Sequence, residues 1–408
     1  MGSPRNGNSV AEEVKMLEAF LAGNPDVDTD KHFCNVARQG RTTVPLTAPG
    51  SILTAIVIDH DILWDNLRMR PAKLWPDWPS VRVWHYYPNH AQIMCFVDEG
   101  EELGGEGFRR CPRSRLLELT QDANTKHRLD FLIGTEIEFF IMQDTKNGPQ
   151  QVDMIPNTYS AASMNNDYLS VVEEIVRSIA KAGIPVRQFY SEGGPGAFEI
   201  SMEPLPPLQS ADALVYSQEA IKWICRKHGL HGTMFPKPFE KLTGIGLHYH
   251  LSMFPNDQGD SFLAGLLDHW KALAAFYLPN YDSYTRVKPG AQVTWGFENR
   301  TNPHLVMLGV ITAGMLGLKS RQELNMKDCD KTMGFKPLDK KELEEYGVID
   351  TIPTSLKEAL HALRNDEALV DKLKPAIVDK YLTLKEKENE TFSKLTLSER
   401  KQISMQLF

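Results

Sequence analysis

The chain has 408 residues, 42% of them hydrophobic, so it can bury a large core and is long enough for more than one domain. Its formal net charge is -8 and its pI is about 5.9, which argues against a general nucleic-acid surface or an anionic-membrane surface. The five cysteines are scattered without a CxxC pair, so we expect reduced thiols rather than a disulfide framework or a zinc site. The first ten residues are polar and lack a secretory signal pattern, and we expect a cytoplasmic protein.

The amino-terminal part predicts a short helix followed by a small sheet. Residues 11–22 place apolar side chains at helical spacing, and Gly23 and Pro25 follow directly. From about residue 30 to 105, short β-rich pieces alternate with proline, glycine and aspartate, at 51–58, 81–87 and 91–97. The glycine-rich stretch 100–107 is the natural boundary, so we expect one domain at 1–105 and a second at 106–408.

After Pro112, helices and strands alternate to the end of the chain. The sequence predicts helices at 113–120, 168–182, 211–228, 262–277 and 303–319, and strands at 130–142, 184–191, 196–202, 246–253 and 291–299. From Thr354 onward the pattern is helical and charged. The apolar run 305–318 is short for a membrane span and typical of a buried helix. The interleaving of the two element types predicts an α+β fold with no membrane insertion.

The most informative stretch is residues 134–140, GTEIEFF, in which Glu136 and Glu138 lie two apart within an apolar run. Residues two apart in a strand share a face, so both carboxylates would point the same way. Two like charges among apolar neighbours raise each other's pKa unless a cation neutralises them, and hard ions such as Mg²⁺ or Mn²⁺ favour carboxylate oxygens. The stretch therefore predicts either a divalent-cation site or an exposed strand face with two solvated glutamates.

Three further stretches carry groups that suit metal or phosphate. Glu192 and Glu199 flank a Gly-Gly-Pro-Gly turn that can return the chain to an adjacent strand. His248 and His250 alternate on one strand face after two glycines. Lys237 is held between two prolines, which gives a rigidly placed ammonium. Alone, the first is better explained by a turn with a polar end and the lysine by solvation. Two alternating histidines beside glycines favour a site more than a lone core histidine does.

Taken in order, these stretches resemble the glutamine synthetase family. GTEIEFF, EGGPGAFE, FPKP, GIGLHYH, Arg286 with WGFENR, and NPHL opening an apolar helix follow that family's catalytic domain from about residue 108 to the end. The carboxy-terminal run from IPTSLKEALHALRNDEALVDKL is similar to the family's closing helices, and FLAGNPDV and PNHAQIMCFVDEG look like its small β-grasp domain. The resemblance implies an α+β fold, in which a small N-terminal β-grasp-like domain precedes a large catalytic domain with an antiparallel sheet flanked by helices.

The resemblance also implies a chemistry. That family phosphorylates a substrate carboxylate with ATP and then lets an amine attack the acyl phosphate, with divalent ions and cationic side chains neutralising the phosphoryl oxygens. It implies Mg²⁺ or Mn²⁺ at two sites, small-molecule carboxylate and amine substrates, and a ring-shaped homo-oligomer with active sites between subunits. By position, one ion would be held by Glu138, Glu192 and Glu199, and the other by Glu136 and His248. The remaining implied residues are Lys237, His250, Ser252 and Arg300 on the nucleotide side, Gly244, Arg286 and Arg300 on the substrate side, and Glu192, Arg286 and Arg300 in catalysis.

The sequence departs from the family pattern at four places. Gln292 stands where the family has an acidic residue that helps to capture ammonium, and no clear counterpart of the aspartate that acts with it appears around residues 45–54. Thr243 stands where an asparagine is common. Between Arg300 and Asn302 the chain lacks a segment that supplies phosphate-binding arginines and a metal-binding Glu-x-Arg. Either that segment is deleted and Arg300 is the phosphate-side arginine, or Glu298 and Arg300 themselves play the Glu-x-Arg part and Glu298 is a metal ligand.

These features favour an ATP-dependent carboxylate–amine ligase that joins glutamate or a related carboxylate to an amine other than ammonia. Two alternatives remain: a binding or regulatory protein that kept the fold, and an enzyme with ATP-independent chemistry.

Overall fold

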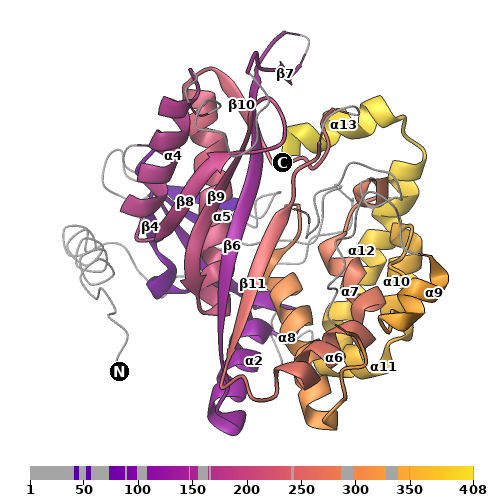
Figure 1. Cartoon of the computed structure of the whole chain (residues 1–408). Helices are drawn as coiled ribbons and strands as arrows, with labels where there is room; N and C mark the ends of the chain where they lie inside the picture. Colours follow the sequence, from indigo (N-terminus) through magenta and orange to yellow (C-terminus); the bar gives the residue numbers. More distant parts are fainter. Residues whose placement is uncertain are drawn as a thin grey trace.

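The large sheet is organised around one long central strand, β6 (Asp130–Gln143), shown in Figure 1. β9 (Ala197–Leu205) runs antiparallel along one edge of β6, with β8 (Val186–Ser191) outside it. β11 (Leu247–Phe254) and β10 (Leu230–Thr233) pair antiparallel with β6 along the other edge, and the short β7 (Gln150–Gln151) pairs with its end. β6 is therefore in contact with strands drawn from more than 100 residues of chain.

This computed structural model describes residues 41–45, 52–56, 73–87, 90–98, 108–146, 148–154, 164, 167–239, 243–285, 298, 300–327, 339–348 and 350–407.

From Thr135 to Ile141, successive side chains of β6 point to opposite faces of the large sheet. On one face, Ile137, Phe139 and Ile141 of β6 are fully buried and pack with Phe198 and Ile200 of β9. Apolar residues of α4 (Leu169–Lys181) and α5 (Pro207–Lys227) cover this face. The opposite face receives the even-numbered residues of β6, which is the side on which both glutamates of GTEIEFF lie.

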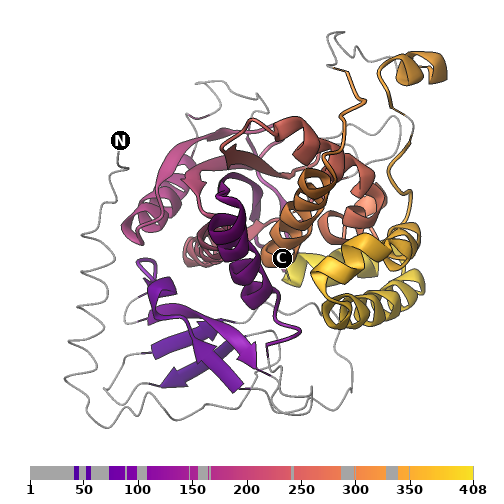
Figure 2. The same ribbon diagram turned by 90° about the horizontal axis from the view of Figure 1, so that it is seen from below.

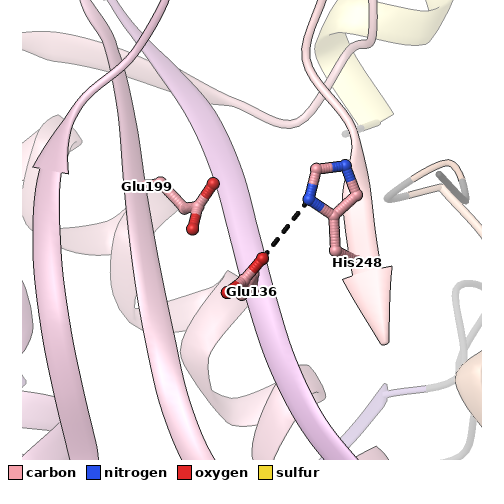
Figure 3. A group of neighbouring side chains, drawn as sticks. All are labelled: Glu136, Glu199 and His248. Atoms are coloured by element: carbon pink, nitrogen blue, oxygen red, sulfur yellow. Dashed lines mark ion pairs between the residues drawn. The ribbon is translucent and has the colours of Figure 1, made fainter. Parts of the chain in front are cut away.

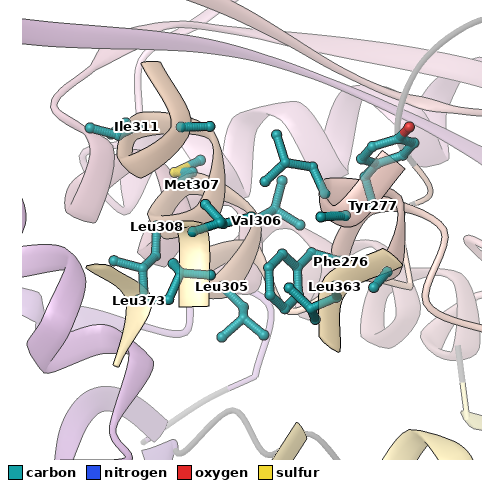
Figure 4. Close-up of a cluster of buried hydrophobic side chains, with 14 of the residues drawn as sticks. Phe276, Tyr277, Leu305, Val306, Met307, Leu308, Ile311, Leu363 and Leu373 are labelled. Carbon is teal, nitrogen blue, oxygen red and sulfur yellow. The ribbon is translucent and has the colours of Figure 1, made fainter. Parts of the chain in front are cut away.

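A second core joins the helices of the carboxy-terminal half. Its centre is α8 (Pro303–Ser320), whose Leu305, Val306 and Leu308 pack against Phe276 of α7 and Leu363 of α10 (Figure 4). The surrounding helices are α2 (Pro112–His127), α6 (Gly259–Asp268), α7 (Trp270–Tyr277), α10 (Leu356–Asn365), α11 (Glu367–Leu373) and α12 (Pro375–Ser393).

By length and composition α8 could cross a membrane, but 72% of its apolar window is buried inside the protein. It crosses α6 so closely that a Cβ on Gly317 would lie 2.1 Å from the Ser261 carbonyl oxygen. Such close approach between helices is the reason for glycine at this position.

A smaller sheet precedes the large domain and lies next to α2 (Figure 2). Its strands are β1 (Arg41–Pro45), β2 (Ile52–Ile56), β3 (Lys73–Pro76), β4 (Arg82–Val83) and β5 (His90–Asp98). β2 is parallel to β5, and β3 and β4 are antiparallel to it. The small N-terminal β domain and the antiparallel catalytic sheet confirm the predicted α+β class. The boundary placed at 100–107 lies outside the described residues.

The predicted elements differ from the observed ones in a few places. The stretch 262–277 forms two helices rather than one, with His269 between them. The Nδ1 of His269 lies 2.6 Å from Asp366 Oδ2. β10, α9 (Lys340–Glu345) and α13 (Leu397–Leu407) were not delimited by the sequence patterns. The predicted helix at 11–22 lies outside the described residues, as does the predicted strand at 291–299 apart from Glu298.

One buried ion network joins the small sheet to the large domain. Arg113, at the start of α2, donates to both oxygens of Asp212 on α5 and pairs with Asp77 of the small domain. His304 at the start of α8 contacts Asp212 Oδ1 at 2.8 Å. Burial opposes ionisation of Asp212, but the Arg113 charge and the His304 contact outweigh it and lower the pKa of this carboxyl to about 2. The network thus fixes three elements and the small sheet together.

Substituting R113M is expected to lower the free energy of unfolding by about 3 kcal/mol or more, because it leaves two partly buried carboxylates, Asp77 and Asp212, without their buried guanidinium partner. R177M is the matched control, since Arg177 is 63% exposed and pairs with Glu173 in the same helix, and it should cost less than about 0.5 kcal/mol. Urea denaturation measures both. Equal costs for the two variants would contradict a central role for the network.

Candidate active site

Three strands bring acidic and imidazole side chains to the face of the large sheet that lies opposite α4 and α5, which we call the open face. Register places Glu138 of β6 opposite Glu199 of β9, and Glu136 of β6 opposite His248 of β11. Figure 3 shows Glu136 between Glu199 and His248. Ligand atoms of these three residues lie within 4.8 Å of one another. The face opposite the helices is therefore a candidate metal centre.

His248 links both glutamates of β6. Its Nδ1 lies 3.4 Å from Glu136 Oε2, and its Nε2 lies 3.5 Å from Glu138 Oε1. The side chain of Glu138 is 2% exposed, and its Oε2 accepts a 2.9 Å hydrogen bond from the Gly246 amide just before β11. Glu136 is more open, at 22%. The pair thus combines one enclosed carboxylate with one that faces solvent.

Glu192 reaches the cluster from the turn between β8 and β9. The Glu192 amide donates to the Ala197 carbonyl at 2.8 Å, which closes the Gly-Gly-Pro-Gly turn. Gly196 has φ +81, and a Cβ there would lie 2.3 Å from the Ile141 carbonyl oxygen, so only glycine fits. Glu192 is buried and acts electrostatically on both Glu138 and Glu199. The turn therefore adds a fourth carboxylate to the site.

Burial and mutual repulsion make the ionised cluster costly. Burial raises the pKa of Glu138 to about 7, with Glu192 and Glu199 adding to the effect and Gly246 and His248 opposing it. Burial also raises the pKa of Glu199, and the nearby Glu136 and Glu192 charges act in the same direction. A divalent cation would remove this repulsion. Carboxylate oxygens with an imidazole nitrogen are a donor set that Mg²⁺ or Mn²⁺ accepts, so the residues present fit the implied ions.

Two hydroxyl groups that the sequence patterns did not single out hold Glu199. Tyr190 of β8 donates a short hydrogen bond to Glu199 Oε1, and Ser201 donates to the same oxygen at 3.2 Å. Both lie two residues from a predicted ligand, Tyr190 before Glu192 and Ser201 after Glu199. Strand periodicity could have placed Ser201 on the Glu199 face, but the pairing of β8 with β9 that brings Tyr190 there cannot be read locally.

The other predicted site residues fall into two places. His250 Nε2 lies 3.1 Å from Glu136 Oε2, and Ser252 follows on the same strand, so both lie along the open face. Lys237 and Arg300 line a separate cavity of about 170 Å³. Gly244 lies against the Pro236 carbonyl, where a Cβ would come within 2.7 Å of the oxygen. Arg286 and Gln292 lie outside the described residues.

Glu298 is not brought into the carboxylate group. Its side chain is fully buried, forms a close ion pair with Arg300, and accepts hydrogen bonds from Ser283 and from Asn280 Nδ2 at 3.2 Å. The metal-compatible group found in the described part of the chain consists of Glu136, Glu199 and His248. The geometry gives no support to the prediction that Glu298 is a metal ligand, because its oxygens already neutralise a buried guanidinium.

Known proteins match this chain over much of its length. The family model for the glutamine synthetase catalytic domain matches residues 109–301 and 300–402. The two matches meet at residues 300–301, where the sequence analysis finds a departure from the family pattern. The Emericella nidulans protein fluG is 32% identical over 320 residues, which is 71% of this chain but only 37% of fluG. Glutamine synthetase of Methanocaldococcus jannaschii is 27% identical over 365 residues, covering 78% of this chain and 79% of that enzyme.

Solved structures share the fold. A structure titled apo GmaS without ligand has a TM-score of 0.71 at 23% identity and covers 94% of this chain and 90% of its own. A GmaS/ADP complex has a TM-score of 0.70 at 22% identity, with 95% and 91% covered.

Metal affinity is expected to rise with pH. Because the pKa of Glu138 is raised to about 7, a cation must displace its proton at pH 6 but not at pH 8, and Mn²⁺ binding should tighten about tenfold over that range. By the same linkage the metal-free fold loses stability as the pH rises from 4.5 towards 7. Calorimetry at several pH values measures the affinity, and a flat profile for the wild-type chain would contradict the assignment.

E298Q tests the position of Glu298. The variant leaves the buried Arg300 charge without its carboxylate partner, so we expect a loss of about 3 kcal/mol in the free energy of unfolding with no change in Mn²⁺ affinity. Denaturation and calorimetry on the same sample separate the two effects. Weakened Mn²⁺ binding in folded E298Q would instead support the prediction that Glu298 is a metal ligand.

Proposed function

Because this chain belongs to the glutamine synthetase family, we propose that it is an ATP-dependent ligase that joins a carboxylate to an amine through an acyl phosphate. The observation that carries the proposal is the convergence of Glu136, Glu138, Glu192, Glu199 and His248 on one sheet face. Buried carboxylates at this density are costly without a cation. Divalent cations that assist a phosphoryl transfer would neutralise these carboxylates.

The ions would be held by residues of the cluster. We assign Glu138, Glu192 and Glu199 to one site and Glu136 and His248 to the other, as in the family. When bound, such ions supply positive charge at the oxygens of the phosphoryl group that moves from ATP. Tyr190, Ser201 and the Gly246 amide hold the carboxylates in place.

The reaction proceeds in two displacements. A carboxylate oxygen of the acid attacks the γ-phosphorus, and ADP leaves with the electrons of the broken bond. The amine nitrogen then attacks the acyl carbon, phosphate leaves, and the nitrogen gives up a proton. Glu192 is our candidate for that base, since it lies on a turn at the edge of the cluster. Arg286 is our candidate to hold the acid's carboxylate.

Altered residues favour an amine other than ammonia. Gln292 is uncharged, so it cannot attract ammonium or accept its proton. Thr243 packs on Gly193, where a Cβ would lie 3.3 Å from its methyl group, and it thus lies beside the Glu192 turn. A substitution there changes the wall next to the proposed base. We therefore propose glutamate or a related carboxylate as acid and a larger amine as partner.

The family assembles its active sites between subunits, and we extend this to a ring-shaped homo-oligomer in the cytoplasm. We place the boundary between its two domains at about residue 105.

A binding or regulatory protein without phosphoryl transfer is the second candidate function. It is favoured by the break in the family match at residues 300–301.

The ligase assignment predicts phosphate release from ATP only when both an acid and an amine are present with Mg²⁺ or Mn²⁺. E136Q should lower that rate by about 100-fold or more, because charge stabilisation of the transferring phosphoryl group is lost. E173Q is the control, since Glu173 lies on the surface of α4 and pairs with Arg177. A coupled phosphate assay over panels of acids and amines measures both.

No amine-dependent release with any pair, together with retained nucleotide binding, would favour the binding protein. Conversion of an amide or an amino acid in the absence of ATP would favour ATP-independent chemistry instead.

A further inference from the structure

One hydroxyl group on the open face contacts two carboxylates that the proposed function gives to different ions. Ser201 of β9 is 3% exposed, and its Oγ lies 3.2 Å from Glu199 Oε1 and 3.5 Å from Glu136 Oε1. Glu199 is assigned to one ion and Glu136 to the other. The Ser201 hydroxyl therefore lies between the two ion positions, and the family resemblance did not imply any role for it.

The register of the large sheet explains this position. Ser201 pairs directly with Glu136 across β9 and β6, and His248 of β11 continues the same row. Glu199, two residues before Ser201, pairs with Glu138 in the neighbouring row. Directly paired residues have Cβ atoms about 5 Å apart, and residues two apart along a strand share a face. β9 thus supplies a carboxylate to one row and a hydroxyl to the other.

Ser201 contacts the oxygen of Glu136 that lies away from the imidazoles. The hydroxyl lies near Oε1, whereas Glu136 Oε2 lies 3.4 Å from His248 Nδ1 and 3.1 Å from His250 Nε2. A hydrogen bond to one oxygen of a carboxylate orients the whole group, and with it the other oxygen. Ser201 therefore helps to direct Glu136 Oε2 toward His248, the residue assigned with Glu136 to the same ion.

The two carboxylates share one proton of Ser201, because a serine hydroxyl has a single proton to donate. Glu199 Oε1 also accepts a short hydrogen bond from Tyr190 of β8. Glu199 therefore retains this donor whenever Ser201 donates to Glu136. Loss of the Ser201 hydroxyl should accordingly disturb Glu136 more than Glu199.

We propose that Ser201 is a positioning residue of the metal centre, whose hydroxyl holds the carboxylates of Glu136 and Glu199 in place and leaves their Oε2 atoms to the two ions. The division of these carboxylates between two ions rests on the proposed function. The role of the hydroxyl rests on its two contacts and on the sheet register. Ser201 thereby links the two ion positions without touching either ion.

Mn²⁺ titrated by calorimetry into the full chain, without nucleotide, tests the proposal. S201A should weaken Mn²⁺ binding about tenfold, a common effect of removing a hydrogen bond that orients a metal ligand. S201T keeps the hydroxyl and should retain the wild-type affinity. Pulsed electron paramagnetic resonance should place the loss on the ion that is coupled to an imidazole nitrogen, because that ion is assigned to Glu136 and His248.

S217A is the matched control. Ser217 of α5 is also buried, but its Oγ lies 3.5 Å from the sulfur of Met202, which belongs to the apolar core on the helix-covered face of the sheet. The variant removes a buried hydroxyl next to the same strand without touching the carboxylates. It should bind Mn²⁺ as the wild type does, and circular dichroism checks that every variant is folded.

The outcomes separate the role of Ser201 from the ligase function. Equal Mn²⁺ affinity in S201A and wild type, an equal loss in S217A, an equal loss in S201T, or no Mn²⁺ binding by the wild type would each overturn the positioning role. A loss confined to the ion without nitrogen coupling would overturn it too. Amine-dependent phosphate release alongside any of these results would leave the ligase function standing. Mn²⁺ binding that depends on the Ser201 hydroxyl, without phosphate release for any pair of acid and amine, would support the positioning role and contradict the ligase.

Discussion

Like-charge crowding on the open face of β6 is the constraint on which the rest of the structure depends. Glu138, Glu192 and Glu199 are all buried within electrostatic reach of one another, and the pKa of Glu138 rises to about 7 as a result of burial and neighbouring charge. Each of these groups would be less costly in water. Tyr190, Ser201 and the Gly246 amide offset part of that cost. A bound divalent cation would offset the remaining free-energy cost of burying these carboxylates.

The fold can maintain this arrangement because one face of the sheet packs against helices while the other carries the charged groups. Ile137, Phe139 and Ile141 bury one face of β6 under α4 and α5, which fixes the register and thereby the direction of Glu136 and Glu138. A one-residue slip would turn the glutamates into the core. The hydrophobic packing on one side is therefore what positions the charges on the other.

Local periodicity was sufficient for much of this site. Alternation in GTEIEFF and GLHYH places Glu136 with Glu138 and His248 with His250, and the structure puts each pair along the open face. Contacts between distant segments could not be predicted in this way. Glu298 is held by Asn280 and Ser283, which lie 18 and 15 positions earlier. Lys237 and Lys401, 164 positions apart in the printed sequence, line one cavity. The contact of His269, between α6 and α7, with Asp366 likewise joins residues almost 100 positions apart.

Anomalous diffraction from crystals of the full chain soaked in Mn²⁺ and a nucleotide would locate any bound cation at once. We expect manganese peaks bound by the carboxylates of Glu136, Glu138, Glu192 and Glu199 and by the His248 imidazole. Crystals that contain the nucleotide but show no manganese at these residues, or show it only at Glu298, would contradict this expectation.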